Sequence, residues 1–236
     1  MEFHPKKCKV IHITNKRKRI EHDYTIHDQT LEVVTKADYL GVTLDSKMTW
    51  NDHVNKVCKK ANMKLGFLRR NLASCPKPTR ETCYKMIVRP ILDYCSSVWD
   101  PHTKQSINKL EQVQRRACRF VCGRYRRTES VTEMMGQTKW PTLEERRCRQ
   151  KATIFFKGQR EEIAIPINTT RENPRKKNVY TQPPSRIDAH RTSFFPSGIK
   201  LWNGLPNNIK QSATILEFKS KLENFPILAL KNPNFH

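Results

Sequence analysis

The sequence predicts an α+β protein with a small N-terminal antiparallel β unit, a mainly helical bundle and a short helical C-terminal appendage. Two hydrophobic periods lead to this prediction. Residues 7–14 alternate polar and apolar side chains, as a half-buried strand does. Residues 51–72 and 105–122 repeat apolar side chains every three or four positions, which is typical of amphipathic helices. A chain of 236 residues is long enough to bury a substantial core.

The β unit is expected to occupy residues 1–48. Polar and apolar alternation is short throughout this region, and basic or turn-forming residues interrupt it. We expect short strands at 7–14, 24–27, 31–34 and 38–44, with a basic turn at 15–19.

The first and longest predicted helix begins at Asn51 and ends near Leu72, within a helical region expected to cover residues 49–160. Trp50 precedes it as a hydrophobic staple. Its apolar face is formed by Val54, Val57, Cys58, Ala61, Leu65, Leu68 and Leu72. Basic residues occupy the opposite face. Phe67 projects among them. Its ring could stack on a base, or it could pack on a neighbouring helix, which is the more common role of such a residue.

Three further helices follow in the same region. The one over 79–92 should break or kink at Pro90, because proline has no amide hydrogen to donate. The helix over 105–122 carries Lys109, Arg116 and Arg119 on its polar side. The motif Thr142-x-x-Glu145 has the form of a capping box and predicts a helix that ends near Lys157.

The C-terminal third changes composition twice. Residues 161–190 are rich in proline and basic side chains without periodicity, which predicts a mobile basic linker. Order is expected to return over 191–236, first in an amphipathic turn that packs Phe195, Ile199 and Trp202 on a core. A second capping-box pattern, Thr214-x-x-Glu217, predicts a last helix to about Phe225 that partly buries Leu216, Phe218 and Leu222.

Charge points to a polyanionic partner. Lysine and arginine number 45 against 22 acids, and the net charge of +23 favours nucleic acid first and anionic membrane second. No apolar run has the length of a membrane span, and the N-terminus lacks the apolar core of a signal peptide. We therefore expect an intracellular protein, cytoplasmic or nuclear, with no membrane partner. The eight cysteines should be reduced thiols, and the sequon at 168–170 should be unglycosylated.

The cysteines and acids are the residues of this sequence that could form a metal site. Cys118-x3-Cys122, together with Cys148, invites a zinc reading. Cys118 falls on an apolar helix face, however, and no second ligand pair has the usual spacing, so core thiols are favoured. Asp45, Asp93 and Asp100 are scattered single acids and not a constellation. We expect no metal site.

Several segments carry a more specific pattern in a fixed order. They are VRPILDYCSSVWDP at 88–101, EQVQRRA at 111–117, WPTLEERR at 140–147 and SFFPSGIKLWNGLP at 193–206. Together they resemble the C-terminal portion of the reverse transcriptase of jockey-like non-LTR retrotransposons. The ordered matches span nearly the whole chain. The resemblance implies that the helical region is thumb-like and that residues 1–48 are the end of a palm domain.

The resemblance also assigns roles to the N-terminal region. FHPKKC at 3–8 resembles the strand after the polymerase active site, with His4 in place of the usual asparagine. It puts Lys7 near the departing pyrophosphate in an intact enzyme. Tyr39, Leu40, Gly41 and Val42 resemble the hairpin that grips the primer end, where glycine permits a close backbone approach. A plain β-turn is the alternative for these four residues.

A helical thumb holds template and primer through their phosphates, so the expected partner is an RNA–DNA hybrid or RNA. The alternative is a solvated basic face without a ligand. The residues expected to contact nucleic acid are Tyr39, Leu40, Gly41, Lys56, Lys59, Lys60, Arg69, Arg70, Arg115, Arg116 and Arg119.

Catalysis is not expected from this chain as it stands. Polymerisation needs aspartates that hold two magnesium ions, and the sequence has no Asp-Asp pair. We assign no catalytic residue and no cofactor, although an intact family member would use magnesium. We expect the chain to start inside a decayed or fragmentary element. Two alternatives remain: it completes a polymerase in trans with the missing fingers–palm portion, or it docks a protein through Phe194, Phe195 and Trp202.

Overall fold

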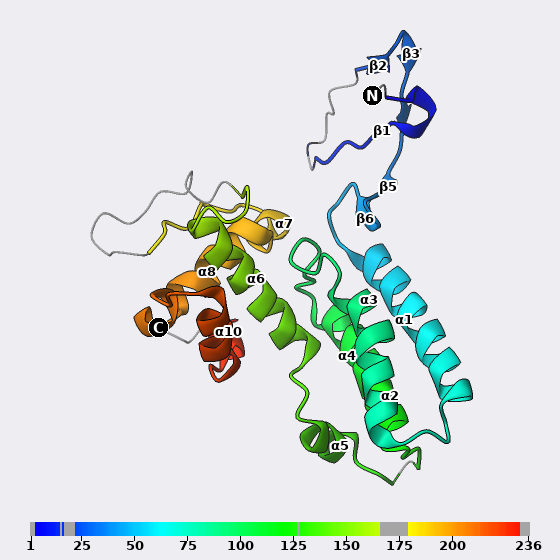
Figure 1. The fold of residues 1–236 in the computed structure, drawn as a ribbon. Helices are drawn as coiled ribbons and strands as arrows, with labels where there is room; N and C mark the ends of the chain where they lie inside the picture. Colours follow the sequence, from blue (N-terminus) through cyan, green and yellow to red (C-terminus); the bar gives the residue numbers. More distant parts are fainter. Residues whose placement is uncertain (1–2, 15, 17–21, 127, 166–178, 232–236) are drawn as a thin grey trace.

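The protein is described here from a computed structural model that covers residues 3–14, 16, 22–126, 128–165 and 179–231. An N-terminal arm of short strands projects from a first helical body, and a second helical body lies beside the first (Figure 1). The α+β prediction is confirmed. The predictions for the turn at 15–19, for the sequon at 168–170 and for the linker over 166–178 fall wholly or largely outside the described residues.

The arm contains the shortest elements of the protein. No described residue before Val42 is buried, so its strands rest on no core of their own. The β2–β3 pair is antiparallel, whereas β1 and β4 pair in parallel. The bounds are Pro5–Lys7 for the 3₁₀ turn η1, Lys9–Val10 for β1, Thr25–Ile26 for β2, Gln29–Thr30 for β3 and Glu32–Val33 for β4.

A tight hairpin connects the arm to the first body. Strands β5 (Lys36–Tyr39) and β6 (Val42–Asp45) pair antiparallel, with Tyr39 opposite Val42. Leu40 and Gly41 both have positive φ, 47° and 81°, as a two-residue hairpin turn of type I′ requires. The prediction of one strand over 38–44 is therefore wrong, because Gly41 lets the chain reverse direction in its middle.

Helix α1 (Asn51–Asn71) starts from an unusual turn that the Asp45 carboxylate organises. Asp45 is buried and accepts hydrogen bonds from the backbone N–H groups of Lys47, Thr49 and Trp50 at 2.9, 3.0 and 3.3 Å. It takes the role of a cap, which the αL residue Trp50 does not supply with its own side chain. The predicted apolar face is confirmed, and Trp50 is buried.

The first body is completed by four helices. The segment predicted over 79–92 runs as α2 (Lys77–Cys83), the π-helical turn η2 (Tyr84–Val88) and α3 (Arg89–Asp93). The expected interruption near Pro90 is confirmed, in the form of a widened turn just before it. The remaining elements are α4 (Lys104–Cys122) and the unpredicted α5 (Val131–Thr138), which Ser130 caps.

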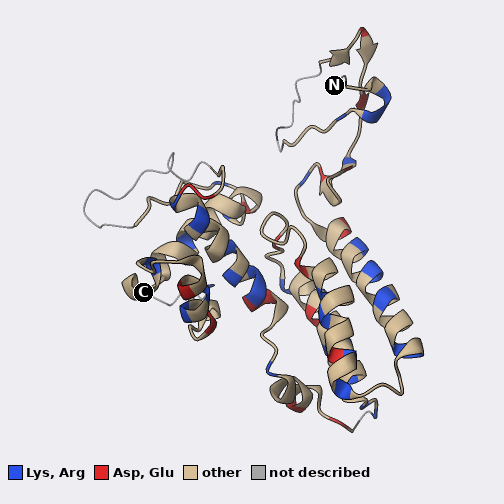
Figure 2. Cartoon of the chain, viewed as in Figure 1, with Lys and Arg blue, Asp and Glu red and all other residues tan. Residues whose placement is uncertain are grey.

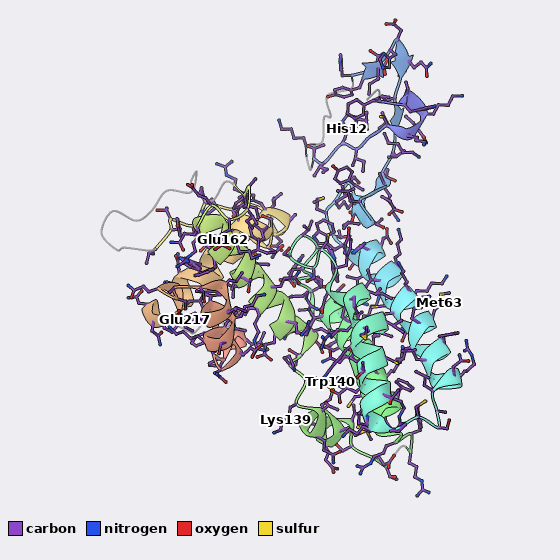
Figure 3. The ribbon with its side chains drawn as sticks, in the orientation of Figure 1. His12, Met63, Lys139, Trp140, Glu162 and Glu217 are labelled. Atoms are coloured by element: carbon purple, nitrogen blue, oxygen red, sulfur yellow. The ribbon has the colours of Figure 1, made fainter. Side chains whose placement is uncertain are left out.

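Helix α6 (Leu143–Gln159) joins the two bodies. Thr142 caps it by accepting from the backbone N–H of Glu145 at 3.1 Å, as the sequence predicted. Leu143 belongs to the first core, whereas Phe155 and Phe156 belong to the second. Trp140, labelled in Figure 3, lies just before this helix and stacks on Tyr84 at 4.6 Å between ring centroids.

The second body surrounds Trp202, which is fully buried. The segment predicted as an amphipathic turn is a full helix, α8, and Ile199 is buried with Trp202. The prediction for Leu216 is wrong: it is 76% exposed, because the start of α10 turns that side toward solvent, while Phe218 and Leu222 are buried. The elements are α7 (Asp188–Arg191), α8 (Phe194–Gly204), α9 (Asn207–Lys210), α10 (Ile215–Glu223) and the 3₁₀ turn η4 (Ile227–Lys231).

Part of the predicted linker is fixed to this second body. Tyr180 is buried against Phe155, with ring centroids 5.4 Å apart. The Asn203 side chain brackets the Tyr180 backbone, accepting from its N–H at 2.9 Å and donating to its carbonyl at 2.8 Å. Residue 180 is therefore anchored by the same helix that carries Trp202.

Candidate nucleic-acid interface

The outer face of α1 gathers exposed basic and apolar side chains. Residues three or four positions apart share one stripe of a helix, so the predicted cations lie along a single line. Figure 2 shows this series of basic residues along α1, and Figure 3 shows Met63 on the outside of the helix. We define the outer face of α1 as Lys56, Lys59, Lys60, Met63, Lys64, Phe67 and Arg70, all of which are exposed.

Most of these cations carry no counter-charge. Lys59, Lys60 and Arg70 have no ion-pair partner in the described part of the chain, and the single acid of α1, Asp52, pairs with Lys36 instead. Lys56 is the exception, because its ammonium lies 2.7 Å from Asp38. Lys56 is consequently a weaker candidate than its neighbours for contact with a phosphate.

Phe67 is 54% exposed and Met63 is 67% exposed. The preferred expectation that Phe67 packs on a neighbouring helix is therefore wrong, because α4 packs on a different side of α1. An aromatic ring between two uncompensated cations is an arrangement suited to stacking on a base.

A polar seam runs between α1 and α4, which lie side by side and in parallel. Three asparagines of α1 each accept a hydrogen bond from a residue 54 or 55 positions later, so one register holds over the length of the contact. The pairs are Ser106–Asn51 at 3.0 Å, Lys109–Asn55 at 2.9 Å and Arg116–Asn62 at 3.1 Å. The seam fixes Arg116 at the edge of the outer face of α1.

A small groove of about 260 Å³ lies at the C-terminal end of this seam. It brings together Arg69, Arg116 and Arg119, three predicted contacts from two helices. The Arg69 guanidinium lies over the Tyr125 ring, 6.0 Å from its centroid. Arg119 donates to the carbonyl of Arg126 at 3.2 Å, so part of its donor capacity is used within the protein.

The remaining predicted contacts lie elsewhere. Arg115 is exposed on α4 but does not line the groove. Tyr39 and Leu40, 67% and 72% exposed, sit at the hairpin tip near the start of α1, roughly 30 Å from its other end. The Tyr94 hydroxyl donates to the Leu40 carbonyl at 3.1 Å and steadies that tip. Lys7 is exposed in η1, out on the arm (Figure 1).

His53 ties the hairpin to the helical body. Its Nδ1 accepts from the backbone N–H of Thr43 at 3.1 Å, and its ring packs edge-on against Trp99 at 4.9 Å between centroids. Burial, assisted by the charge of Lys56, lowers the pKa of His53 below its ordinary value. The neutral imidazole is the form that can accept this hydrogen bond.

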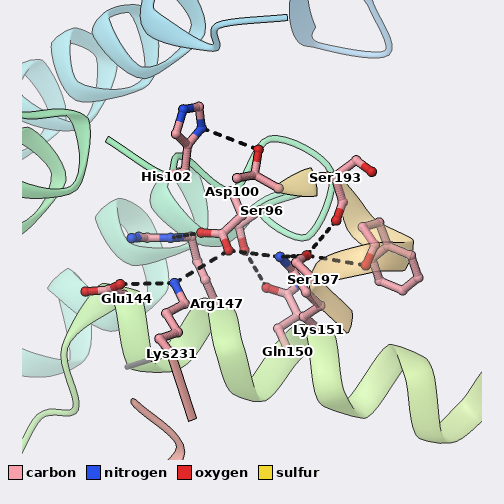
Figure 4. A network of polar contacts seen from close by, with 12 residues as sticks. Ser96, Asp100, His102, Glu144, Arg147, Gln150, Lys151, Ser193, Ser197 and Lys231 are labelled. Carbon is pink, nitrogen blue, oxygen red and sulfur yellow. Dashed lines mark hydrogen bonds and ion pairs between the residues drawn. The ribbon is translucent and has the colours of Figure 1, made fainter. Parts of the chain in front are cut away.

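A buried charge cluster holds the two bodies together, although the sequence predicted Asp100 to be a single, isolated acid. Asp100 accepts from Arg147 Nε at 2.9 Å and from Lys151 Nζ at 3.0 Å (Figure 4). Lys231 of η4 approaches within 3.8 Å of the same carboxylate and lies 3.0 Å from Glu144. Burial acts to raise the pKa of Asp100, but the facing cations outweigh it, and the pKa lies below its ordinary value. The spacing of Arg147 and Lys151, one helical turn apart in α6, is the signal that points to a shared partner.

The thiols show no ligand arrangement. Cys118 and Cys148 are buried, and burial raises the pKa of the Cys118 thiol to about 11. Within the described ranges, no three histidine, cysteine or acidic residues are grouped so that they could hold a metal ion. No described helix is both long and apolar enough to cross a membrane.

Comparisons with known proteins bear on lineage. The chain is similar to three Drosophila melanogaster proteins: the probable RNA-directed DNA polymerase from transposon BS (28% identical over 94 residues), that from transposon X-element (26% over 90) and the RNA-directed DNA polymerase from mobile element jockey (29% over 98). These matches cover 37–39% of this chain and 10–11% of each relative, so the chain spans about a tenth of the length of the curated relatives it matches. No protein-family model and no solved structure matches it. The similarity confirms the resemblance to jockey-like reverse transcriptases.

Proposed function

We propose that this chain is a C-terminal part of a non-LTR retrotransposon reverse transcriptase that binds template–primer nucleic acid and does not polymerise on its own. The observation that carries the proposal is the outer face of α1, where Lys59, Lys60, Lys64 and Arg70 are exposed and form no ion pair with any described residue. Such a row suits a phosphate backbone, because each contact releases condensed counterions.

The two helices offer two kinds of contact. The outer face of α1 supplies flexible lysines with Phe67 between them, whereas the groove supplies Arg69 and Arg116 from facing helices. Lysine ammonium groups follow a backbone as point charges, and guanidinium groups bind phosphate oxygens in pairs. An A-form-like hybrid is recognised by its backbone shape, so this surface fits an RNA–DNA hybrid or RNA better than a sequence-specific DNA site.

Binding of an RNA–DNA hybrid, duplex DNA and RNA across a salt series tests the proposal, with magnesium-dependent primer extension measured in parallel. We expect hybrid binding that weakens steeply with salt, and no extension. Binding that is insensitive to salt would contradict a phosphate interface. Extension by the chain alone would contradict the proposal that it does not polymerise on its own.

A second function is favoured by the arm. None of its described residues before Val42 is buried. Its four strands β1 to β4 have two residues each, and every one of these residues is exposed or half-buried. A partner polypeptide that covers the arm, such as a fingers–palm portion supplied in trans, would give these strands a core. Primer extension should then appear only when both polypeptides are mixed.

The alternative that this chain docks a protein through its C-terminal aromatic residues is weakened, because one of them is not accessible. Trp202 is fully buried in the second core, where it packs on Phe155 at 5.2 Å between centroids. Phe195 is partly buried against the same core. These side chains hold the second body together, and they do not form an exposed aromatic surface.

A further inference from the structure

A cavity in the described structure lies between the two bodies and is not part of the basic surface of α1. Its volume is about 630 Å³, within the range of about 300–1,000 Å³ that small-molecule sites occupy. The loop that carries Asp100 and His102 forms one wall, and α6, α8 and η4 form the others. The lining includes Asp100, His102, Glu144, Lys151, Arg191, Thr192, Lys200 and Lys231.

The charges of this cavity do not balance. Four lining cations, Lys151, Arg191, Lys200 and Lys231, face two lining carboxylates, Asp100 and Glu144. Arg191 also pairs with Asp188, which lies just outside the lining, so one positive charge remains in excess. The excess is largest at the mouth, because Lys200 is exposed and has neither an ion pair nor a hydrogen bond among the described residues. An uncompensated cation beside a partly enclosed space favours an anionic ligand.

The deeper layer adds to the excess. Behind Asp100, the guanidinium of Arg147 is 1% exposed and its two Nη nitrogens have no hydrogen-bond partner. Its Nε uses one oxygen of the Asp100 carboxylate, and Lys151 uses the other (Figure 4). Because buried cations gain from every nearby negative charge, this layer also favours an anion in the cavity.

The cavity is larger than an inorganic phosphate needs, and part of its wall is apolar. Ile107, Leu201 and Leu230 line it together with Pro101 and Pro196. Thr192 and Gln182 also line the cavity with a hydroxyl and an amide side chain. Asn203 lines it too, but both ends of its amide are bonded to the Tyr180 backbone. An apolar wall with a few polar groups suits a ring system that carries hydrogen-bonding edges.

We infer that this cavity binds a phosphate-bearing ligand of mononucleotide size, with its phosphate at Lys200 and Arg191 and its ring against the apolar wall. The ligand chemistry is the same for a free nucleotide and for the phosphorylated end of a nucleic-acid strand. The inference is independent of the α1 surface, which lies on a different part of the protein.

Calorimetric titration of the full chain with AMP, adenosine and inorganic phosphate tests the inference. We expect AMP to bind saturably and more tightly than either of its parts. Lys200→Glu should weaken AMP binding at least about tenfold, as the loss of a charge-assisted hydrogen bond does. The matched control is Lys219→Glu, which makes the same charge change at an exposed residue of α10 outside the cavity and should leave AMP binding unchanged.

Two results would overturn the inference: no saturable AMP binding at millimolar concentration, or equal AMP binding by Lys200→Glu and the wild type. Arg191→Gln provides a second variant if Lys200→Glu lowers the melting temperature. A short single strand with and without a 5′-phosphate distinguishes the two ligand sources, since only the phosphorylated strand should compete with AMP if strand ends use the site. If the protein does not bind the hybrid, the proposed function is refuted. The inference about the cavity is then still decided by the AMP titration alone.

Discussion

Substitution of Asp100 by asparagine should weaken the junction between the two bodies more than any other single charge removal at that junction. Asparagine keeps the shape of the side chain and one acceptor oxygen but removes the charge. The Asp100 side chain is 7% exposed, and its partners Arg147 and Lys151 are 1% and 2% exposed. Loss of one partner of a buried ion pair costs about 3–5 kcal/mol, because the remaining charge stays buried without compensation.

The expected loss for Asp100→Asn is therefore about 3–5 kcal/mol in the free energy of unfolding, measured by urea titration with far-UV circular dichroism. Asp93→Asn is the matched control. Asp93 pairs with Arg146 at 2.6 Å across the same junction, but both side chains are 21–30% exposed, so its loss should be about 1 kcal/mol or less.

Two further measurements sharpen this prediction. Adding Lys151→Met to Asp100→Asn removes one of the orphaned cations and should recover part of the loss, about 0.5–3 kcal/mol for neighbouring residues. Because the pKa of Asp100 is lowered in the folded protein, its contribution is present above its unfolded pKa of about 3.9 and is lost as the pH falls below that value. The two stability curves should thus converge in acid. A loss no larger than that of Asp93→Asn would refute the reasoning.

Other predictions concern the hairpin and the arm. Because the pKa of His53 is lowered in the folded protein, the free energy of unfolding should fall as the pH drops below about 6.5. A His53→Phe variant should lack this part of the pH dependence in urea titrations. Equal slopes of the free energy of unfolding against pH in variant and wild type would contradict this prediction. Leu40→Asn should stabilise the protein and Gly41→Val should destabilise it, each by roughly 1–2 kcal/mol, since both positions have positive φ; opposite signs in thermal melts would reject the turn assignment. Hydrogen exchange should be faster in the first 45 residues than in 51–122, and equal protection would show that the arm is stable by itself.

Periodicity was enough to locate the helices of the first body, with the exception of α5. The apolar stripe of α1 and the capping boxes at Thr142 and Thr214 depend only on residues close together in sequence. The folded protein therefore contains them as predicted. The exposed cations of the outer face of α1 follow from the same stripe. Short-range patterns therefore predicted most of the candidate interface on α1.

Long-range pairing was not accessible in the same way. The partners of Asp100 lie 47 and 51 residues away in sequence, and nothing local marks which acid will meet which cation. The same limit applies to the seam, where Asn62 meets Arg116 across 54 residues. Alternation alone predicted one strand over 38–44, whereas the resemblance at 39–42 indicated the hairpin that the structure contains, with Gly41 in its turn.

The exposure of Phe67 shows how a helix face can be assigned wrongly from composition alone. An aromatic residue is usually buried, and the sequence favoured packing on a neighbour. Helix α4 instead lies along the asparagine side of α1, which leaves Phe67 among the lysines. The direction from which a neighbouring helix arrives decides such cases, and it depends on residues far away in the chain.

The central claim is that the outer face of α1 binds a nucleic-acid backbone. The most direct measurement is the affinity for an RNA–DNA hybrid across a salt series, for the wild type and for the triple variant Lys59→Gln, Lys60→Gln, Arg70→Gln. A second triple variant, with Lys104, Lys139 and Lys219 changed to glutamine, removes the same charge from exposed positions elsewhere. We predict that the first variant binds more weakly and that its log–log salt slope falls by about 2–3, close to 0.9 per lost contact, while the second stays near the wild type. An equal loss of affinity in both variants would show that binding depends only on the net charge of the protein. That result would contradict a specific interface on α1.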